Sequence, residues 1–340
     1  MRYLLLVLPL FLISCGGGNT KSALPKDLDS LLTYHANRFE EDTTNMEYRK
    51  LYVEVLIQHG TKMLKDLDFP KALDDGAKAF RLDSTNFEAR MLFADVLNNR
   101  PERTMDDVSA AQRHYAYSVK KQAKNTKALV GLASTYSQQM DFDQSFKYIN
   151  QALRINPRYR DAYVLKGSNY LVLGKIDLAK SSYETAVQQD PKFFEAYLML
   201  GSLYQAEKNP ICIEYYTTAA ELQPKNPDVL YALAYAKQVF GKVDEALPIY
   251  RNMIQIDTSY YIALFQIGHI KQFNVGELDS AIYFYKSALQ SEPRFVEAWH
   301  NLGLCYEDLG DKTRALQSYA KALKYNPDFE LSRKQADALR

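Results

Sequence analysis

Length, composition and charge exclude several classes of protein. The chain has 340 residues, of which 47% are hydrophobic and 24% are charged, as in an ordinary folded soluble protein. Its 14 glycines and 12 prolines fall below the average usage of about 12% for the two together, which disfavours a turn-rich all-β fold and a disordered chain. The net charge is only +1, so overall charge does not favour binding to nucleic acid or to an anionic membrane surface.

The N-terminus has the features of a secretory signal peptide. Arg2 precedes an apolar run over residues 3–13, which is too short to cross a bilayer because a spanning helix needs about 20 residues. The run ends with a Leu-Ile-Ser sequence directly before Cys15. This arrangement resembles the lipobox of bacterial lipoproteins, and the resemblance implies removal of residues 1–14 and attachment of a lipid to the thiol of Cys15. The alternative is an ordinary signal peptide with an incidental cysteine.

Residues 15–24 are predicted to be a flexible tether between the lipid and the folded part of the chain. The three glycines at 16–18 are followed by small and polar residues, a composition typical of flexible linkers. Residue 16 is Gly, not the Asp that resembles an inner-membrane retention signal in some bacteria. We therefore expect a lipid-anchored protein of the bacterial cell envelope, at the outer membrane and facing the periplasm.

Residues 25–52 are predicted to be a helical lead-in. Leu28, Leu31, Leu32 and His35 recur at the spacing of one helix face, so this face can pack on the segment that follows. We expect the lead-in to cap the N-terminal end of the folded body.

The body of the chain is built from an internal repeat. Prolines at 157, 191, 224, 293 and 327 are separated by 34, 33, 69 and 34 residues, and 69 corresponds to two periods. Two rows of small residues, broken only by Met253, keep the same register. They are Gly60, Ala94, Ala133, Gly167, Gly201, Ala234, Gly268 and Gly303, and Ala79, Ser118, Ala152, Ala186, Ala219, Met253, Ala288 and Ala322.

Each unit has the pattern of two antiparallel helices, as the last unit illustrates. Trp299, Leu302, Gly303 and Tyr306 lie at i, i+3, i+4 and i+7 and form one face of a helix. A second helix has its own apolar face at 315, 319, 322 and 323, after a turn at 310–311. Pro327 ends this helix because proline disfavours helical geometry in the residue before it. Packing between such helices also explains why the chain has as many as 26 tyrosines.

The period and these positions resemble the tetratricopeptide repeat family. The resemblance implies an all-α fold, a right-handed α-solenoid of helix-turn-helix units, with residues 330–340 as a capping helix. The match is weakest in the first two units, where His59 and Gly76 replace an expected Leu and an expected aromatic residue. The eight units are 53–86, 87–125, 126–159, 160–193, 194–226, 227–260, 261–295 and 296–329, with five extra residues in unit two, one fewer in unit five and one more in unit seven.

The resemblance places the partner-binding surface on the concave side of the solenoid, along the first helix of each unit. The fifth residue of each unit is expected to point there, and a column of exposed apolar residues of this kind is typical of a partner site. The alternative is that neighbouring side chains cover the column. Its members are Ile57, Met91, Val130, Val164, Leu198, Tyr231, Phe265 and His300.

Aromatic residues and histidines gather on this face in the C-terminal half of the chain. Aromatic residues are common interface anchors because they offer a large contact area at low entropic cost. We expect an extended or helical segment of a partner protein to bind there. The carboxylate clamp known in the family needs Lys and Asn in two columns of one unit, and no unit has this pair. The candidate groove comprises Tyr231, Tyr235, Phe265, His269, Phe273 and His300, together with Leu198 and Val164.

The sequence offers no support for catalytic or cofactor chemistry. It has no HExxH motif and no P-loop, and His269 and His300 are not joined by a column of carboxylates that could complete a metal site. Cys212 and Cys305 lie at core positions of non-adjacent units, which predicts two buried free thiols rather than a disulfide. We therefore expect no catalytic residue, metal or cofactor, no small-molecule substrate and no nucleic-acid partner.

These observations favour a non-catalytic scaffold or adaptor that is tethered to the bacterial envelope and binds a protein partner. One alternative is a pilotin-like chaperone that escorts an outer-membrane or secretion-system subunit. Another is an enzyme with a cryptic site, which would require a matched base and nucleophile on the concave face.

Overall fold

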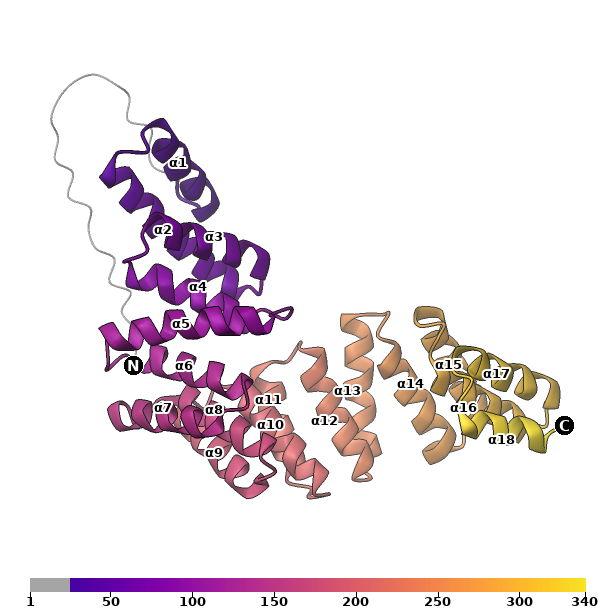
Figure 1. The fold of residues 1–340 in the computed structure, drawn as a ribbon. Coiled ribbons are helices and arrows are strands. Elements are labelled where there is room, and N and C mark those ends of the chain that lie inside the picture. Colours follow the sequence, from indigo (N-terminus) through magenta and orange to yellow (C-terminus); the bar gives the residue numbers. More distant parts are fainter. Residues whose placement is uncertain (1–24) are drawn as a thin grey trace. The chain divides into compact units, whose positions relative to one another are not determined.

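The computed structural model describes residues 25–340, and the regular elements in that range are eighteen α-helices and one short π-helix (Figure 1). No strand occurs among the described residues, and the predicted all-α solenoid is confirmed. The predicted signal peptide, Cys15 and the tether lie outside this range. No helix within residues 25–340 is both long and apolar enough to cross a membrane. The chain divides into two compact units, with the boundary between Ala123 and Lys124.

A polar side chain starts each helix of the first unit. The helices are α1 (Leu28–Glu41), α2 (Met46–Lys65), α3 (Phe69–Leu82), α4 (Phe87–Asn99) and α5 (Met105–Lys121). The residues before them, Asp27, Asn45, Asp68, Asn86 and Thr104, each accept a hydrogen bond from a backbone amide of the first turn. Because Asn45 starts α2, the predicted limit of the lead-in at residue 52 falls inside a helix, so residues 25–52 comprise one complete helix and the beginning of the next.

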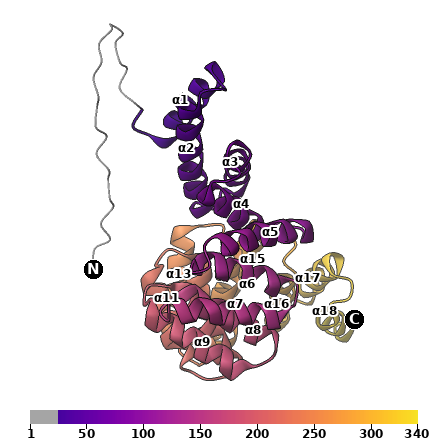
Figure 2. The ribbon, with the colours of Figure 1, turned by 60° about the vertical axis from the view of Figure 1, so that its left-hand side comes forward.

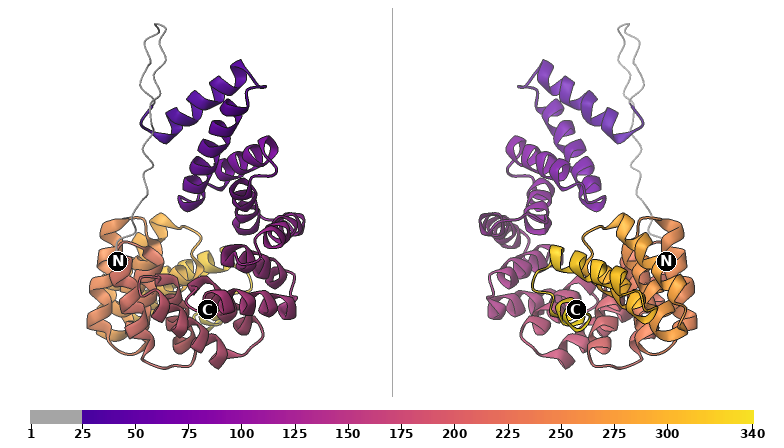
Figure 3. Two further views of the ribbon diagram at one scale, coloured as in Figure 1. Left: turned by 90° about the vertical axis from the view of Figure 1, so that its left-hand side faces the viewer. Right: turned by 90° about the vertical axis from the view of Figure 1, so that its right-hand side faces the viewer.

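The second unit contains the other thirteen α-helices, and each of them packs against the next one along the chain. Figures 2 and 3 show the successive helix pairs lying side by side. Predicted units two to eight each begin at the first residue of a helix. The helices are α6 (Thr126–Gln138), α7 (Phe142–Ile155), α8 (Arg160–Val172), α9 (Ile176–Gln189), α10 (Phe194–Ala206), α11 (Cys212–Leu222), α12 (Pro227–Val239), α13 (Val243–Ile256), α14 (Tyr261–Ile270), α15 (Leu278–Ser291), α16 (Val296–Asp308), α17 (Lys312–Tyr325) and α18 (Glu330–Ala338).

Glycine and tyrosine make the closest contacts within several helix pairs. Gly201, Gly268 and Gly303 each face a buried tyrosine ring, and a Cβ atom at Gly303 would lie 2.4 Å from Cε1 of Tyr319. This separation is far below van der Waals contact, so the absence of a side chain lets α16 and α17 approach each other. The tyrosines of the second helices are correspondingly buried. Tyr115, Tyr183, Tyr216, Tyr250, Tyr285 and Tyr319 are each at most 4% exposed.

The extra residues predicted in units two and seven lie in a loop, in a longer helix and in one π-helical turn. In unit two, five loop residues (100–104) separate α4 from α5, and α5 has 17 residues, whereas the second helix of unit three, α7, has 14. In unit seven, the extra residue falls in a single π-helical turn, η1 (Lys271–Val275), which extends α14. Gly276 follows with φ 80°, a left-handed conformation that favours glycine, and α15 then begins at Leu278.

Candidate functional site

Helices α12, α14, α16 and α18 line a groove of about 500 Å³ in the second unit. Its volume lies within the range of about 300–1,000 Å³ that is typical of ligand-binding clefts. Three of these helices are the first helices of consecutive repeats, and α18 is the C-terminal helix that follows them. The lining residues are Tyr235, Gln238, Val239, Phe265, Gln266, His269, Asn274, Glu297, His300, Asn301, Phe329 and Leu331.

Aromatic rings form one wall of this groove. Tyr231 and Tyr235 are stacked with ring centroids 5.7 Å apart, and Tyr235 is 36% exposed. The rings of Phe265 and Phe295 pack edge to face with centroids 4.8 Å apart, and this contact fixes the ring of Phe265. Leu331 on α18 adds an apolar side chain that is 59% exposed. The groove therefore presents exposed apolar contacts on rigid supports.

A chain of hydrogen bonds fixes two amide side chains in the groove. The hydroxyl of Tyr250 donates to Oε1 of Gln238 at 2.8 Å, and Nε2 of Gln238 donates to Oε1 of Gln266 at 3.2 Å. Nε2 of Gln266 in turn donates to the hydroxyl of Tyr231 at 3.3 Å. Asn301 is held similarly, since its Nδ2 donates to the hydroxyl of Tyr285 at 3.3 Å. These amides are therefore oriented before any partner arrives.

Burial favours the neutral form of the two histidines of the groove. Burial lowers the pKa of both His269 and His300 below the usual value of 6.5. Nδ1 of His300 lies 3.0 Å from Oγ of Ser332, a contact that joins α16 to α18. Glu297 is then the one charged residue among those that line the groove. The groove is consequently suited to an apolar segment with polar backbone groups rather than to a highly charged one.

The predicted site residues divide into three groups. Tyr235, Phe265, His269 and His300 line the groove together. Two more lie next to it, because Tyr231 stacks on Tyr235 and the ring of Phe273 lies 4.6 Å from that of His269. The last two lie elsewhere, since Val164 packs against the core around Tyr183 and Leu198 packs against the core around Tyr216.

The column formed by the fifth residues of the units is not an exposed strip. Met91 and His300 are buried, and the other six members are half-buried. Ile57, Val130 and Phe265, for example, pack against the buried cores of their own units. The prediction of an exposed apolar column is therefore wrong, because neighbouring helices cover its side chains.

The sequence interpretation missed the polar part of the groove. Gln266 and Asn301 are the sixth residues of units seven and eight, directly after the column formed by the fifth residues. The sequence does contain a signal for one of them, because Gln266 is a lone amide in the otherwise apolar start of α14 and is only 8% exposed. A buried amide of this kind needs hydrogen-bond partners, and their arrangement depends on the neighbouring repeats.

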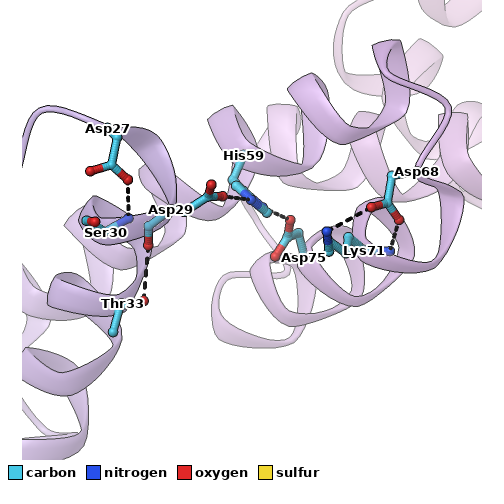
Figure 4. A network of polar contacts seen from close by, with 8 residues as sticks. All are labelled: Asp27, Asp29, Ser30, Thr33, His59, Asp68, Lys71 and Asp75. Carbon is cyan, nitrogen blue, oxygen red and sulfur yellow. Dashed lines mark hydrogen bonds and ion pairs between the residues drawn. The ribbon is translucent and has the colours of Figure 1, made fainter.

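A separate polar network lies in the first unit and is centred on His59 (Figure 4). Nδ1 of His59 lies 2.5 Å from Oδ2 of Asp75 on α3, and Nε2 lies 2.8 Å from Oδ1 of Asp29 on α1. Burial acts to lower the pKa of His59, but the hydrogen bonds to the two carboxylates outweigh it and raise the pKa. Because both ring nitrogens are occupied by carboxylates, this histidine is not placed to act as a catalytic base. The network instead joins α1, α2 and α3.

The two cysteines of the described range are free and buried, as predicted. Burial raises the pKa of the Cys305 thiol to about 12 and also raises that of Cys212. Because the thiolate is the reactive form, both side chains behave as small apolar core residues. Within residues 25–340, no group of three or more His, Cys, Asp and Glu side chains is arranged to hold a metal ion.

Three of the repeats match models of a known family. Models of the tetratricopeptide repeat match residues 126–159, 161–193 and 296–329. These three segments of the chain are tetratricopeptide-like repeats. The matched segments correspond to units three, four and eight of the predicted register, which are among the six units in which the tetratricopeptide pattern is most regular.

The chain is similar to parts of several curated proteins. The chain is 26% identical over 194 residues to human tetratricopeptide repeat protein 6, which covers 56% of this chain and 37% of the relative. It is 28% identical over 163 residues to the BBSome complex member BBS4 homolog of Drosophila melanogaster, which covers 46% of this chain and 33% of the relative. The chain thus spans about a third of the length of the curated relatives it matches.

Solved structures with a similar fold include a protein described as containing TPR repeats. The C-terminal part of a TPR repeat-containing protein from Cytophaga hutchinsonii has a TM-score of 0.60 and 17% identity, and the match covers 73% of this chain and 98% of that one. The human IFIT1 dimer has a TM-score of 0.54 and 18% identity, and the match covers 88% of this chain and 78% of that one. At these identities the likeness concerns the fold alone.

Proposed function

We propose that this protein is a non-catalytic scaffold that binds a segment of a partner protein in the groove between α12 and α18. Tetratricopeptide repeats are commonly protein-binding modules, which supports the general class. The observation that carries the specific site is the combination of the exposed Tyr235 and Leu331 with amides already oriented by hydrogen bonds. Fixed aromatic and amide groups reduce the entropic cost of binding.

The chemistry of the groove defines the proposed partner segment. Apolar side chains of the segment would contact Tyr235, Phe265 and Leu331, while its backbone groups would pair with the amides of Gln266 and Asn301. The groove has one carboxylate and no cationic side chain among its lining residues, so it does not favour a terminal carboxylate. An uncharged, extended or helical internal segment fits these groups.

The proposal includes attachment to the bacterial envelope through a lipid on Cys15, at the outer membrane and facing the periplasm. It is supported by the apolar run before Cys15 and by the glycines that follow. Metabolic labelling with a fatty acid tests it directly. We expect label and membrane fractionation in the native chain and neither in Cys15→Ala, and an unlabelled native chain would contradict the anchor.

Site-specific photo-crosslinking in native membranes tests the groove. A photoreactive phenylalanine at Tyr235 should crosslink one partner, and the same residue at Tyr283, which is 66% exposed on α15 and does not line the groove, should not. Leu331→Glu should reduce the yield at position 235, because it places a charge on the apolar wall. Identical products from both positions would contradict the proposal. A secretin-type oligomer as the captured partner would favour the pilotin-like alternative.

A further inference from the structure

We propose that a second pocket, between α15 and α17 and floored by α16, binds a phosphate monoester that carries an apolar or aromatic body. The pocket has a volume of about 560 Å³ and is separate from the groove described above, since the two share no lining residue. Four of its lining residues are cationic and none is acidic. The proposal does not depend on the protein-binding function.

The floor of the pocket is apolar and aromatic. Trp299, Leu302 and Tyr306 line it from one face of α16. Two cations from the flanking helices converge on one ring, because Nζ of Lys286 lies 5.7 Å and Cζ of Arg314 lies 4.4 Å from the centroid of Tyr306. Positive charge and aromatic surface are therefore placed together.

In units three and five, a tyrosine side chain fills the equivalent position. In unit three, Tyr148 stacks on Tyr136 at 5.7 Å. In unit five, Tyr215 stacks on Tyr204 at 5.4 Å. Each of these tyrosines lies four residues before the small core residue of its second helix. In unit eight that residue is Ala322, so the corresponding position is Ser318, which lines the pocket instead of filling it. The space is thus open in unit eight where units three and five carry a tyrosine, and unit four likewise has a serine, Ser182, at this position.

Two of the cations distinguish unit eight from units three to seven. Lys321 and Arg314 occupy positions at which units three to seven have no Lys or Arg. Arg314 is partly compensated, because its Nε lies 2.5 Å from Oδ2 of Asp311. Within the part of the chain that the structure describes, Lys286, Lys321 and Lys324 form no ion pair. A chain of net charge +1 therefore carries here a concentrated and largely uncompensated positive site.

These features select the class of ligand. Three ammonium groups and a guanidinium can neutralise a dianion better than a monoanion, and a phosphate monoester offers three acceptor oxygens to them. The indole of Trp299 and the adjoining apolar surface would contact the body of the ligand. A soluble aryl or nucleoside phosphate and the headgroup of phosphatidic acid share this chemistry.

Trp299 provides the assay, because it is the single tryptophan of the chain. Titration of the full-length protein with phenyl phosphate, with excitation of Trp299, should give a saturable change in emission that weakens as salt is added. Inorganic phosphate and benzyl alcohol, which each lack one half of the ligand, should bind more weakly. A second titration uses phosphatidylcholine vesicles with and without phosphatidic acid. A change in Trp299 emission with the vesicles that contain phosphatidic acid, but not with phenyl phosphate, would identify a lipid as the ligand.

Matched variants separate the pocket from general charge. Lys286→Gln combined with Lys321→Gln should weaken binding at least about tenfold, since hydrogen bonds to charged groups contribute that much or more. Lys312→Gln combined with Lys334→Gln removes the same charge outside the pocket lining and should bind like the native chain. Ser318→Tyr should fill the pocket as Tyr148 and Tyr215 do in units three and five, and abolish binding while the helical circular dichroism is retained. Equal loss in both double variants, or no response to either phosphate source, would overturn the proposal.

Discussion

Replacement of Gly303 by alanine should destabilise the C-terminal repeat through a clash with one ring. The new Cβ would lie 2.4 Å from Cε1 and 2.7 Å from Cδ1 of Tyr319. That ring is fully buried, and its hydroxyl donates to Oε2 of Glu307 at 2.7 Å, so it cannot move without losing packing and a hydrogen bond. Overpacking of this kind costs about 1–3 kcal/mol, while the better helix propensity of alanine returns up to about 1 kcal/mol. We expect a net loss of about 1–2 kcal/mol in the free energy of unfolding.

Gly167→Ala provides the matched control, because Gly167 occupies the same position in unit four. Its Cβ would lie 3.0 Å from the ring of Tyr183, a contact that a small adjustment can relieve. We expect a change within about 0.5 kcal/mol for this variant, since the gain in helix propensity offsets the tight contact. Urea denaturation of the full chain, followed by circular dichroism for both variants and by Trp299 emission for Gly303→Ala, measures the difference. Equal stability of Gly303→Ala and the native chain, or a larger loss in Gly167→Ala, would refute the steric argument.

Two further predictions concern the first unit. The raised pKa of His59, caused by Asp75 and Asp29 against the opposing effect of burial, means that the folded state binds the proton more tightly than the unfolded state. The stability that protonation of His59 contributes should be complete below about pH 6.5 and decline as pH rises through the raised folded value, and His59→Gln should flatten that slope in thermal unfolding followed over pH. Thr104→Ala should cost about 1 kcal/mol because Thr104 and Asp107 form a capping box at the start of α5, and an unchanged urea midpoint would argue against that role.

Much of the fold was accessible from the sequence because the repeat marks its own boundaries. Prolines and small residues recur with one period, and the helices of units two to eight begin where that period places them. The start of α2 was less accessible, since the first repeat departs from the pattern and the decisive signal is local. Asn45 accepts hydrogen bonds from the amides of Glu47 and Tyr48 and starts the helix there.

The groove was only partly accessible for a different reason. Periodicity identifies the face of a helix on which a residue lies. How far a neighbouring repeat buries that residue depends on how the helix pairs are stacked. Tyr235 and Phe265 line the groove, whereas Leu198, in the same column as Phe265, packs against the core around Tyr216. The hydrogen-bonded pair of Gln238 and Gln266 spans two repeats, so no single unit of the sequence contains it.

The π-helical turn at Lys271–Val275 is the place where unit seven accommodates its extra residue. The added residue widens one turn at the end of α14, and Tyr285 on α15 still meets Gly268 at the position that Tyr319 takes opposite Gly303. The contact between the tyrosine ring and the glycine is therefore preserved when the connecting turn contains an additional residue. A designer who wishes to graft a peptide loop onto this scaffold would choose the η1 turn, where the chain has already tolerated growth without displacing the next helix.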